Sequence, residues 1–343
     1  MKNKSLKLLS LLSCLLLTVG FAACTQNDSS SSLDETLSNA VSESGSVTEN
    51  SSIDESSSIE EVSSEEENSS EEVNSSMEDS SSEEDSSSES GGYEEPVVGS
   101  VGLDYELSSD GMYYSVVGIG TCTDTDLIIP TTYKDLPVIS IGERAFQNCY
   151  RLASVVIPDS VTSIGYKAFL RCSSMTSVVI PDSVASIGDS AFEWCDSLTS
   201  VAIPDRVTSI GSSTFEYCYR LASVVIPDCV TTIGNQAFYG CSGLTSVVIG
   251  DSVASIGDSA FYECSSLTSV VIPDCVVTIG CRVFAFCSSL TSVVIPDSVT
   301  SIGEYTFSNC YDLTIYCEAA SQPSGWSSSW DFSIDSIVWG YEC

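Results

Sequence analysis

Histidine is absent from all 343 residues of this sequence. Without an imidazole the chain has no Ser-His or Cys-His nucleophile pair, no histidine general base and no histidine-containing metal site. The glycine patterns of phosphate-binding and dinucleotide-binding loops are missing as well. We therefore expect that the protein is not an enzyme and that it uses no cofactor and no metal ion.

Basic residues are scarce. Lys and Arg number 11 against 48 Asp and Glu, for a net charge of −37. Three of the 11 are Lys2, Lys4 and Lys7, which leaves 8 for the rest of the chain. A nucleic-acid surface needs clustered cations that neutralise phosphates. The composition predicts that nucleic acid is not a partner.

What the chain has in abundance is one 23-residue unit, whose cleanest copy, residues 154–176, reads SVVIPDSVTSIGYKAFLRCSSMT. Its glycine recurs in eight copies, at Gly142, Gly165, Gly188, Gly211, Gly234, Gly257, Gly280 and Gly303. Such self-similarity predicts a solenoid. The roughly eight inward side chains of one unit bury too little apolar surface to offset the conformational entropy that is lost when the unit becomes ordered. A unit is therefore stable only when neighbours bury its faces.

The first half of the unit has the period of a β-strand. Val155 and Ile157 are expected to point inward, and the residues between and before them outward. Pro158 has no N–H for a ladder and ends the strand. A second extended piece covers residues 161–164. Stacked units then pair their strands into a parallel sheet, which advances about 4.8 Å per coil.

The second half of the unit follows Gly165, where we expect a positive φ or a close-packed corner. Ala168, Phe169 and Cys172 come next, at spacings of one and three. This spacing suits one or two helical turns with an apolar side toward the core. The predicted fold is an α/β solenoid of eight 23-residue units with a parallel sheet.

Half of the 16 cysteines occupy one position of the unit, from Cys149 to Cys310 in steps of 23. Neighbouring side chains at that position run parallel, which is a poor geometry for a disulfide. We expect these thiols to be buried and free. If any disulfide forms among the other cysteines, Cys317 with Cys343 is the pair we expect.

The order of the apolar residues resembles a known family. Leu-x-x-Val-x-Ile-Pro at 152–158, Ile-Gly at 164–165 and Ala-Phe-x-x-Cys at 168–172 are similar to the BspA-type leucine-rich repeats of bacterial surface proteins. The resemblance covers residues 140–313 well and 102–139 and 314–340 more loosely. It implies a leucine-rich-repeat coil and a cell-surface protein that is often adhesive, and it does not imply a ligand.

The N-terminus reads as a signal peptide, residues 1–23, with three lysines before an apolar run that is too short to span a membrane. The run ends at Phe21-Ala22-Ala23-Cys24, which looks like a bacterial lipobox with Phe in place of the usual Leu or Val. We expect lipidation of Cys24, which would anchor the protein on the extracellular face of a bacterial membrane. Ordinary cleavage near Ala22, which would give a secreted protein, is the alternative.

Residues 24–95 form an acidic, serine-rich segment. From Thr25 to Glu95 there are 22 acidic residues and no Lys or Arg. Such a segment cannot bury enough apolar surface to order itself, so we expect a disordered, extended tether. An acidic solubilising tail without a further role is the alternative.

The repeat region, residues 141–313, needs a cover at each open end. At the N-terminal end, residues 96–140 read as a cap that begins with a β-hairpin, whose strands are 103–107 and 112–117. At the C-terminal end, residues 314–343 read as a cap that contains Trp326, Trp330 and Trp339. We expect these tryptophans to pack against the last coil rather than to bind a ligand.

Two surfaces of the solenoid are candidates for partner binding. The outward strand positions hardly vary: serine recurs from Ser154 to Ser292, and valine from Val156 to Val294 except at Ala202. Variation lies in the segment after each glycine, where five successive units carry one aromatic residue each. These residues are Trp194, Tyr217, Tyr239, Tyr262 and Phe286. A ladder of such residues would suit protein or sugar partners, or it would lie flat and seal the outer core.

The leading hypothesis is a lipid-anchored adhesion or interaction protein that displays the solenoid and binds an extracellular protein or glycan through its flank. A structural surface spacer without a specific ligand is the alternative, which the uniform strand face favours. An enzyme is the third possibility, and the missing histidine and the lack of a carboxylate cleft argue against it.

Overall fold

The structure is a computed structural model that describes residues 99–342. The predicted signal peptide 1–23, the predicted lipidation site Cys24 and the acidic segment 24–95 lie outside the described residues. Within residues 99–342, nothing has the helical length and hydrophobicity that crossing a lipid bilayer requires.

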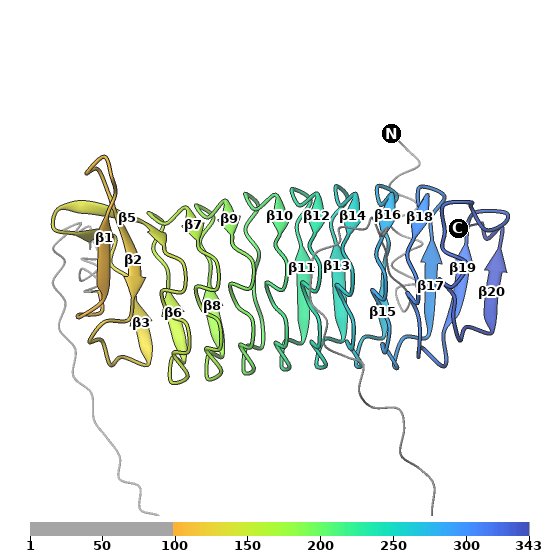
Figure 1. The fold of residues 1–343 in the computed structure, drawn as a ribbon, viewed down its shortest axis with the longest axis horizontal. Coiled ribbons are helices and arrows are strands. Elements are labelled where there is room, and N and C mark those ends of the chain that lie inside the picture. The colour runs from red at the N-terminus through yellow and green to blue at the C-terminus, as the bar shows by residue number, and fades with distance from the viewer. Residues whose placement is uncertain (1–98, 343) are drawn as a thin grey trace, which may run out of the picture. The chain divides into compact units, whose positions relative to one another are not determined.

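Each repeat unit forms one coil of a solenoid, with a second strand near its middle and, in all coils but one, a first strand near its start (Figure 1). In the coil that contains Ser200, isolated bridges to Ser177 and Ser223 take the place of the first strand. The first strands are β3 (Asp126–Ile128), β6 (Ser154–Val156), β8 (Ser177–Val179), β11 (Ser223–Ile226), β13 (Ser246–Ile249), β15 (Ser269–Val270), β17 (Ser292–Ile295), β19 (Thr314–Cys317) and β20 (Ser336–Trp339). The second strands are β5 (Leu136–Ile141), β7 (Ser163–Ile164), β9 (Ser186–Ile187), β10 (Ser209–Ile210), β12 (Thr232–Ile233), β14 (Ser255–Ile256), β16 (Thr278–Ile279) and β18 (Ser301–Ile302).

Neighbouring repeat coils pair in parallel and in the register that the 23-residue period requires. In the first set Val224 lies opposite Val247, and in the second set Ile210 lies opposite Ile233. The second strands form two sheets, β1-β2-β5-β7-β9 and β10-β12-β14-β16-β18, with no pairing between β9 and β10. The stack of the second strands is therefore interrupted between the coil that contains Gly188 and the coil that contains Gly211.

The repeat glycines occupy close-packed corners and have no positive φ. A Cβ at Gly234 would lie 2.7 Å from the backbone carbon of Gly211, and one at Gly257 would lie 2.7 Å from that of Gly234. Gly211 differs, because a Cβ there would meet the carboxylate of Asp189 at 2.4 Å instead. Only glycine allows coils to approach so closely, which is why this residue recurs once per unit.

The core is a column of phenylalanines that runs through all eight predicted units. Phe146, Phe169, Phe192, Phe215, Phe238, Phe261, Phe284 and Phe307 are each 0% exposed. Successive rings are stacked with centroids 5.2 to 6.2 Å apart. Val, Ile and Leu from the strands and their flanks complete the core on both sides of this column. The inward alternation predicted for Val155 and Ile157 is confirmed, since they are 2% and 4% exposed.

The helical turns expected after each glycine are absent, and consecutive β-turns replace them among the described coils. The N–H groups of Ala168 and Leu170 donate to the carbonyl oxygens three residues earlier, at 3.2 Å each. The N–H groups of Lys167, Phe169 and Arg171 donate instead to the next coil, to the carbonyl oxygens of Asp189, Ala191 and Glu193 at 2.8 to 3.0 Å.

The physical reason for this correction is that a segment of about eight residues could close few helical hydrogen bonds, whereas the stack offers an acceptor to every second N–H. The pattern requires left-handed backbone at Lys167 (φ 54°) and Arg171 (φ 61°). The same two positions are left-handed in every repeat coil, mostly with residues other than glycine. Spacings of one and three between Ala, Phe and Cys fit turns as well as they fit a helix.

At the N-terminal end, the predicted hairpin is present as β1 (Asp104–Leu107) and β2 (Tyr114–Gly118), which pair antiparallel. Strand β2 pairs with β5 in parallel, and β4 (Thr132–Tyr133) pairs with β5 in antiparallel orientation. Tyr105 and Tyr133 stack with ring centroids 3.9 Å apart. The hairpin therefore extends the second sheet by two strands.

At the C-terminal end, the chain continues the solenoid further than we expected. Strand β20 pairs in parallel with β19, with Ile315 opposite Ile337. Trp330, 23 residues after Phe307, extends the aromatic column and contacts that ring at 6.0 Å. Trp330 is 0% exposed and Trp326 is 5% exposed, and both contact Trp339. These contacts show that the tryptophans pack the last coil.

Candidate binding surface on the loop flank

The five aromatic residues singled out by the sequence form one continuous row of ring contacts, which we call the aromatic row. Its members are Trp194, Tyr217, Tyr239, Tyr262 and Phe286. Successive ring centroids are 4.2, 5.2, 4.7 and 5.3 Å apart. Aromatic rings at these separations attract one another beyond the area that they bury. The row therefore fixes its own geometry along the flank formed by the turns.

The aromatic residues of the row occupy two different positions of the repeat unit, and their rings nevertheless stay in contact. Trp194, Tyr217 and Phe286 directly precede the repeat cysteine, whereas Tyr239 and Tyr262 directly follow the repeat phenylalanine. Gly240 makes the step possible, because a Cβ at this residue would lie 2.5 Å from Cδ1 of Tyr217. The ring of Tyr217 thus lies over a glycine and reaches Tyr239.

The rings of the aromatic row are partly exposed to solvent and partly packed against the coils. Trp194, Tyr217, Tyr239 and Tyr262 are half-buried. Phe286 is 41% exposed. Tyr219 lies beside the row, within 5.9 Å of Trp194 and 5.7 Å of Tyr217, and is 38% exposed. Sequence reasoning missed Tyr219, although its place directly after a repeat cysteine is shared with the exposed Tyr150 and Tyr311.

Carboxylates lie beside the aromatic row and affect its phenols. Burial raises the pKa of Tyr239, and Tyr217 and Glu263 raise it further. Burial also raises the pKa of Glu216. Burial raises the pKa of Tyr262 too, so the phenols of Tyr239 and Tyr262 stay protonated and can donate hydrogen bonds at neutral pH. Carboxylates along the border disfavour an anionic partner at this part of the row.

The strand face is the second candidate surface, and it is chemically uniform. Val156, Val179, Val225 and Val248 are between 50% and 69% exposed. They form a stripe of identical apolar residues beside a column of serines. Such a face can bury apolar area against a partner, but its side chains do not distinguish one coil from the next.

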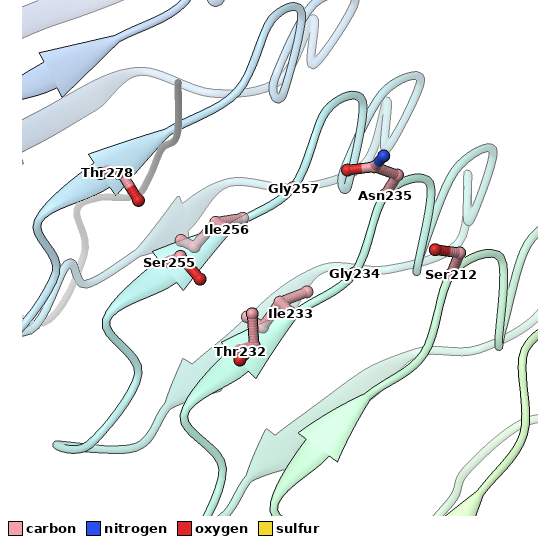
Figure 2. A pocket seen from close by; sticks show the side chains of 9 residues that line it. All are labelled: Ser212, Thr232, Ile233, Gly234, Asn235, Ser255, Ile256, Gly257 and Thr278. Atoms are coloured by element: carbon pink, nitrogen blue, oxygen red, sulfur yellow. The ribbon is translucent and has the colours of Figure 1, made fainter. Parts of the chain in front are cut away.

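A shallow hollow of about 300 Å³ lies over the second strands (Figure 2). Its lining residues are Ser212, Thr232, Ile233, Gly234, Asn235, Ser255, Ile256, Gly257 and Thr278. Asn235 Oδ1 already accepts a hydrogen bond of 2.9 Å from the N–H of Asp258. The hollow contains no charged group and no nucleophile other than hydroxyls, so it has no catalytic constellation.

The cysteine column is confirmed as a set of buried or half-buried free thiols from Cys149 to Cys310. Each thiol after the first donates to the carbonyl oxygen of a phenylalanine in the preceding coil, as Cys241 does to Phe215 at 3.1 Å. Burial raises the pKa of these thiols, to about 12 at Cys310. They are therefore core residues that hold no thiolate at neutral pH.

The expected disulfide between Cys317 and Cys343 is wrong, because Cys317 is a free thiol. Cys317 is buried in β19, where the parallel pairing with β17 and β20 places it in the core. Burial raises the pKa of Cys317 to about 12, which also makes it a poor nucleophile for disulfide exchange.

The part of the chain that the structure describes holds no group of three or more His, Cys, Asp or Glu side chains arranged to bind a metal ion. The aspartates that follow the repeat prolines form a column of turns instead. Asp228 Oδ1 accepts a hydrogen bond of 2.9 Å from the N–H of Asp251 in the next coil.

The stacked parallel coils with inward Leu, Val, Ile and Phe define a leucine-rich-repeat solenoid. The family model of the BspA type Leucine rich repeat region matches residues 139–265 and 208–319, which together span more than half of the chain. The chain therefore belongs to the BspA-type leucine-rich-repeat family, as the resemblance predicted. No curated protein matches this chain.

Several solved structures are similar to this chain, including the following two. The T. pallidum leucine-rich repeat protein is 28% identical, with a TM-score of 0.50, over 62% of this chain and 88% of that chain. A leucine rich cell surface protein from Faecalibacterium prausnitzii A2-165 is 25% identical, with a TM-score of 0.32, over 71% of this chain and 94% of that chain.

Proposed function

We propose that this protein is a cell-surface interaction module that binds an extracellular protein or glycan through the aromatic row. The supporting observation is the continuity of the row over five coils, with rings in mutual contact and with accessible faces. Half-buried aromatic residues with polar neighbours supply large contact areas at low entropic cost, and they dominate the energetics of many interfaces.

Surface display rests on the N-terminal sequence and on family membership. A signal peptide at 1–23 and lipidation of Cys24 would anchor the chain, and the acidic segment 24–95 would hold the solenoid away from the membrane. We include in the proposal that the chain is a binding protein and not an enzyme, which the missing histidine supports.

The test compares the purified protein with two double variants on arrays of matrix proteins and glycans. Tyr239→Ala with Tyr262→Ala removes the centre of the row, and Val225→Thr with Val248→Thr changes the strand face by the same number of residues. We expect the row variant to lose about tenfold or more in affinity for whatever the wild type binds, and the strand variant to change little.

The spacer function is the second candidate, and the uniform strand face favours it. Under this hypothesis neither the wild type nor any variant binds to either array or to whole cells. A loss of binding in the strand variant, with the row variant unaffected, would move the site to the valine stripe.

A further inference from the structure

The N-terminal end of the aromatic row opens into a hollow of about 310 Å³ that differs from the one in Figure 2. Its lining residues are Tyr150, Arg171, Ser173, Trp194 and Asp196. They come from three successive coils and lie directly before or directly after the repeat cysteine. The hollow thus brings together two aromatic rings, one guanidinium, one carboxylate and one hydroxyl.

The two charged groups of the hollow form no ion pair among the described residues. Asp196 Oδ1 is buried and has no hydrogen-bond partner in the structure. Arg171 is exposed, and the ion pair found among residues 99–342 is a different one, between Arg144 and Glu143. Asp196 Oδ1 is therefore free to accept a hydrogen bond from a bound ligand.

The aromatic walls are held in position by neighbours that are not part of the hollow. Trp194 is half-buried and contacts Tyr217 at 4.2 Å and Tyr219 at 5.9 Å. Tyr150 is 53% exposed, and its hydroxyl donates to Asn148 Oδ1 at 3.1 Å. The left-handed backbone at Arg171 and Trp194, with φ of 61° and 58°, is tied to the next coil by hydrogen bonds of 2.8 Å.

We propose that this hollow is a subsite for one neutral pyranose residue of a glycan. The apolar face of the sugar ring stacks on Trp194, one hydroxyl accepts a hydrogen bond from Arg171, and a neighbouring hydroxyl donates to Asp196. Rotation about the side-chain bonds of Asp196 turns its carboxylate toward that hydroxyl. The inference rests on the proposed function, because it places the first sugar of a bound chain at one end of the aromatic row.

The charges of the hollow favour a neutral sugar over other ligands. An acidic sugar would pair with Arg171 but would place its anion beside Asp196, and a cationic side chain would meet the opposite conflict. A purely apolar group would leave both charged groups desolvated and unpaired, which is unfavourable. A vicinal diol offers one acceptor and one donor at adjacent atoms and so satisfies both groups at once.

Isothermal titration of the full-length protein tests the proposal. The probes are neutral gluco-oligosaccharides, manno-oligosaccharides and galacto-oligosaccharides in α and β linkage, an oligogalacturonate as the anionic probe and trilysine as the cationic probe. Arg171→Gln and Asp196→Ala are the subsite variants, and Arg206→Gln is the matched control, since Arg206 is exposed beside a Pro-Asp turn away from the hollow. We expect at least one neutral probe to bind, each subsite variant to weaken it about tenfold or more, and the control to change it less than about twofold.

A second variant keeps the test independent of folding. Asp196→Asn preserves the shape of the side chain and removes the unpaired charge, so the variant should unfold at the same temperature as the wild type or higher, while it binds the neutral probe more weakly. Tighter binding of the oligogalacturonate or of trilysine than of every neutral probe would overturn the subsite.

The outcomes separate this proposal from the one on which it rests. If Tyr239→Ala with Tyr262→Ala abolishes binding while both subsite variants bind as the wild type does, the row is a binding surface and the subsite is wrong. If the protein binds a matrix protein through the row but no neutral oligosaccharide, the subsite is wrong as well. Silence with every protein and every glycan would overturn both.

Discussion

Truncation of one phenylalanine in the middle of the column tests whether the solenoid behaves as a one-dimensional stack. Phe215 is 0% exposed and stacks between Phe192 at 5.5 Å and Phe238 at 5.4 Å. Phe307 is equally buried, but its neighbours Phe284 and Trp330 lie 6.2 and 6.0 Å away, and Trp330 meets it edge to face. The two sites therefore differ in position and in tightness of packing.

The expected magnitude follows from the loss of buried area and from the cavity. A fully buried Phe changed to Ala typically costs about 3–5 kcal/mol in free energy of unfolding. Because coils contact only their neighbours, the loss affects one coil and its two interfaces. Phe215→Ala should lie near the top of this range because its ring stacks closely on both sides. Phe307→Ala should lie lower, because its neighbours are more distant.

Hydrogen exchange of the full-length protein, followed by mass spectrometry, is the assay. Phe215→Ala should expose amides of several coils on both sides of residue 215, and more so because the second sheet is already interrupted between β9 and β10. Phe307→Ala should expose amides from β18 to β20 and leave the coils before residue 280 protected. Val248→Ala, at a side chain that is 57% exposed, serves as the control and should change little.

An equal loss of protection along the whole chain in both phenylalanine variants would contradict this reasoning. Such a result would mean that the core unfolds as one cooperative unit, in which a defect has the same consequence wherever it lies. The order of the two variants in free energy of unfolding is a separate outcome and depends only on local packing.

Four further predictions concern backbone conformation, thiol burial, the pH dependence of stability and membrane attachment. Ser259→Gly, at a left-handed residue with φ 54°, should raise the free energy of unfolding by about 0.5–1 kcal/mol in a denaturant titration, whereas Ser265→Gly, at a residue without a positive φ, should lower it. Maleimide labelling should modify the repeat cysteines only after denaturation, because the thiols are buried, and cross-links among them in an unreduced digest would contradict the assignment as free thiols. Burial raises the pKa of the repeat thiols, so they stay protonated in the folded protein at a pH where the thiols of the unfolded chain ionise. Their contribution to stability should therefore be constant below about pH 9 and fall above it, by about 1.4 kcal/mol per pH unit for each such thiol, and Cys195→Ala should reduce this slope. Cys24→Ala should release the protein from bacterial membranes into the medium, and failure of the wild type to incorporate labelled palmitate would show that Cys24 is not an acylation site.

The repeat pattern alone specifies the solenoid, its period and the contents of its core. A 23-residue period without insertions leaves one register in which Phe stacks on Phe and glycine on glycine, so the columns through Phe215 and Cys218 can be read directly from the amino-acid sequence. The strand alternation at Val155 and Ile157 is a local property of the same kind, since side chains of an extended chain point to opposite faces.

How the chain turns after each glycine depends on contacts between coils. Whether Ala168 and Phe169 belong to a helix or to β-turns is set by hydrogen bonds to the next coil, which residue spacing within one unit does not report. The same contacts hold Arg171 and Trp194 in the left-handed conformation, which sets the direction of their side chains.

Side-chain direction is the reason that the hollow at Asp196 was not predicted from the sequence. Tyr150, Trp194 and Asp196 come from different units and from two positions of the unit, and only the stacking of coils brings them to one place. Trp330 is the counterpart at the other end. The spacing of 23 residues between Phe307 and Trp330 can be read from the sequence. Only the contact between the two rings, at 6.0 Å, shows that Trp330 continues the aromatic column. The reason is that a tryptophan in a divergent segment does not by itself reveal which neighbour it packs against.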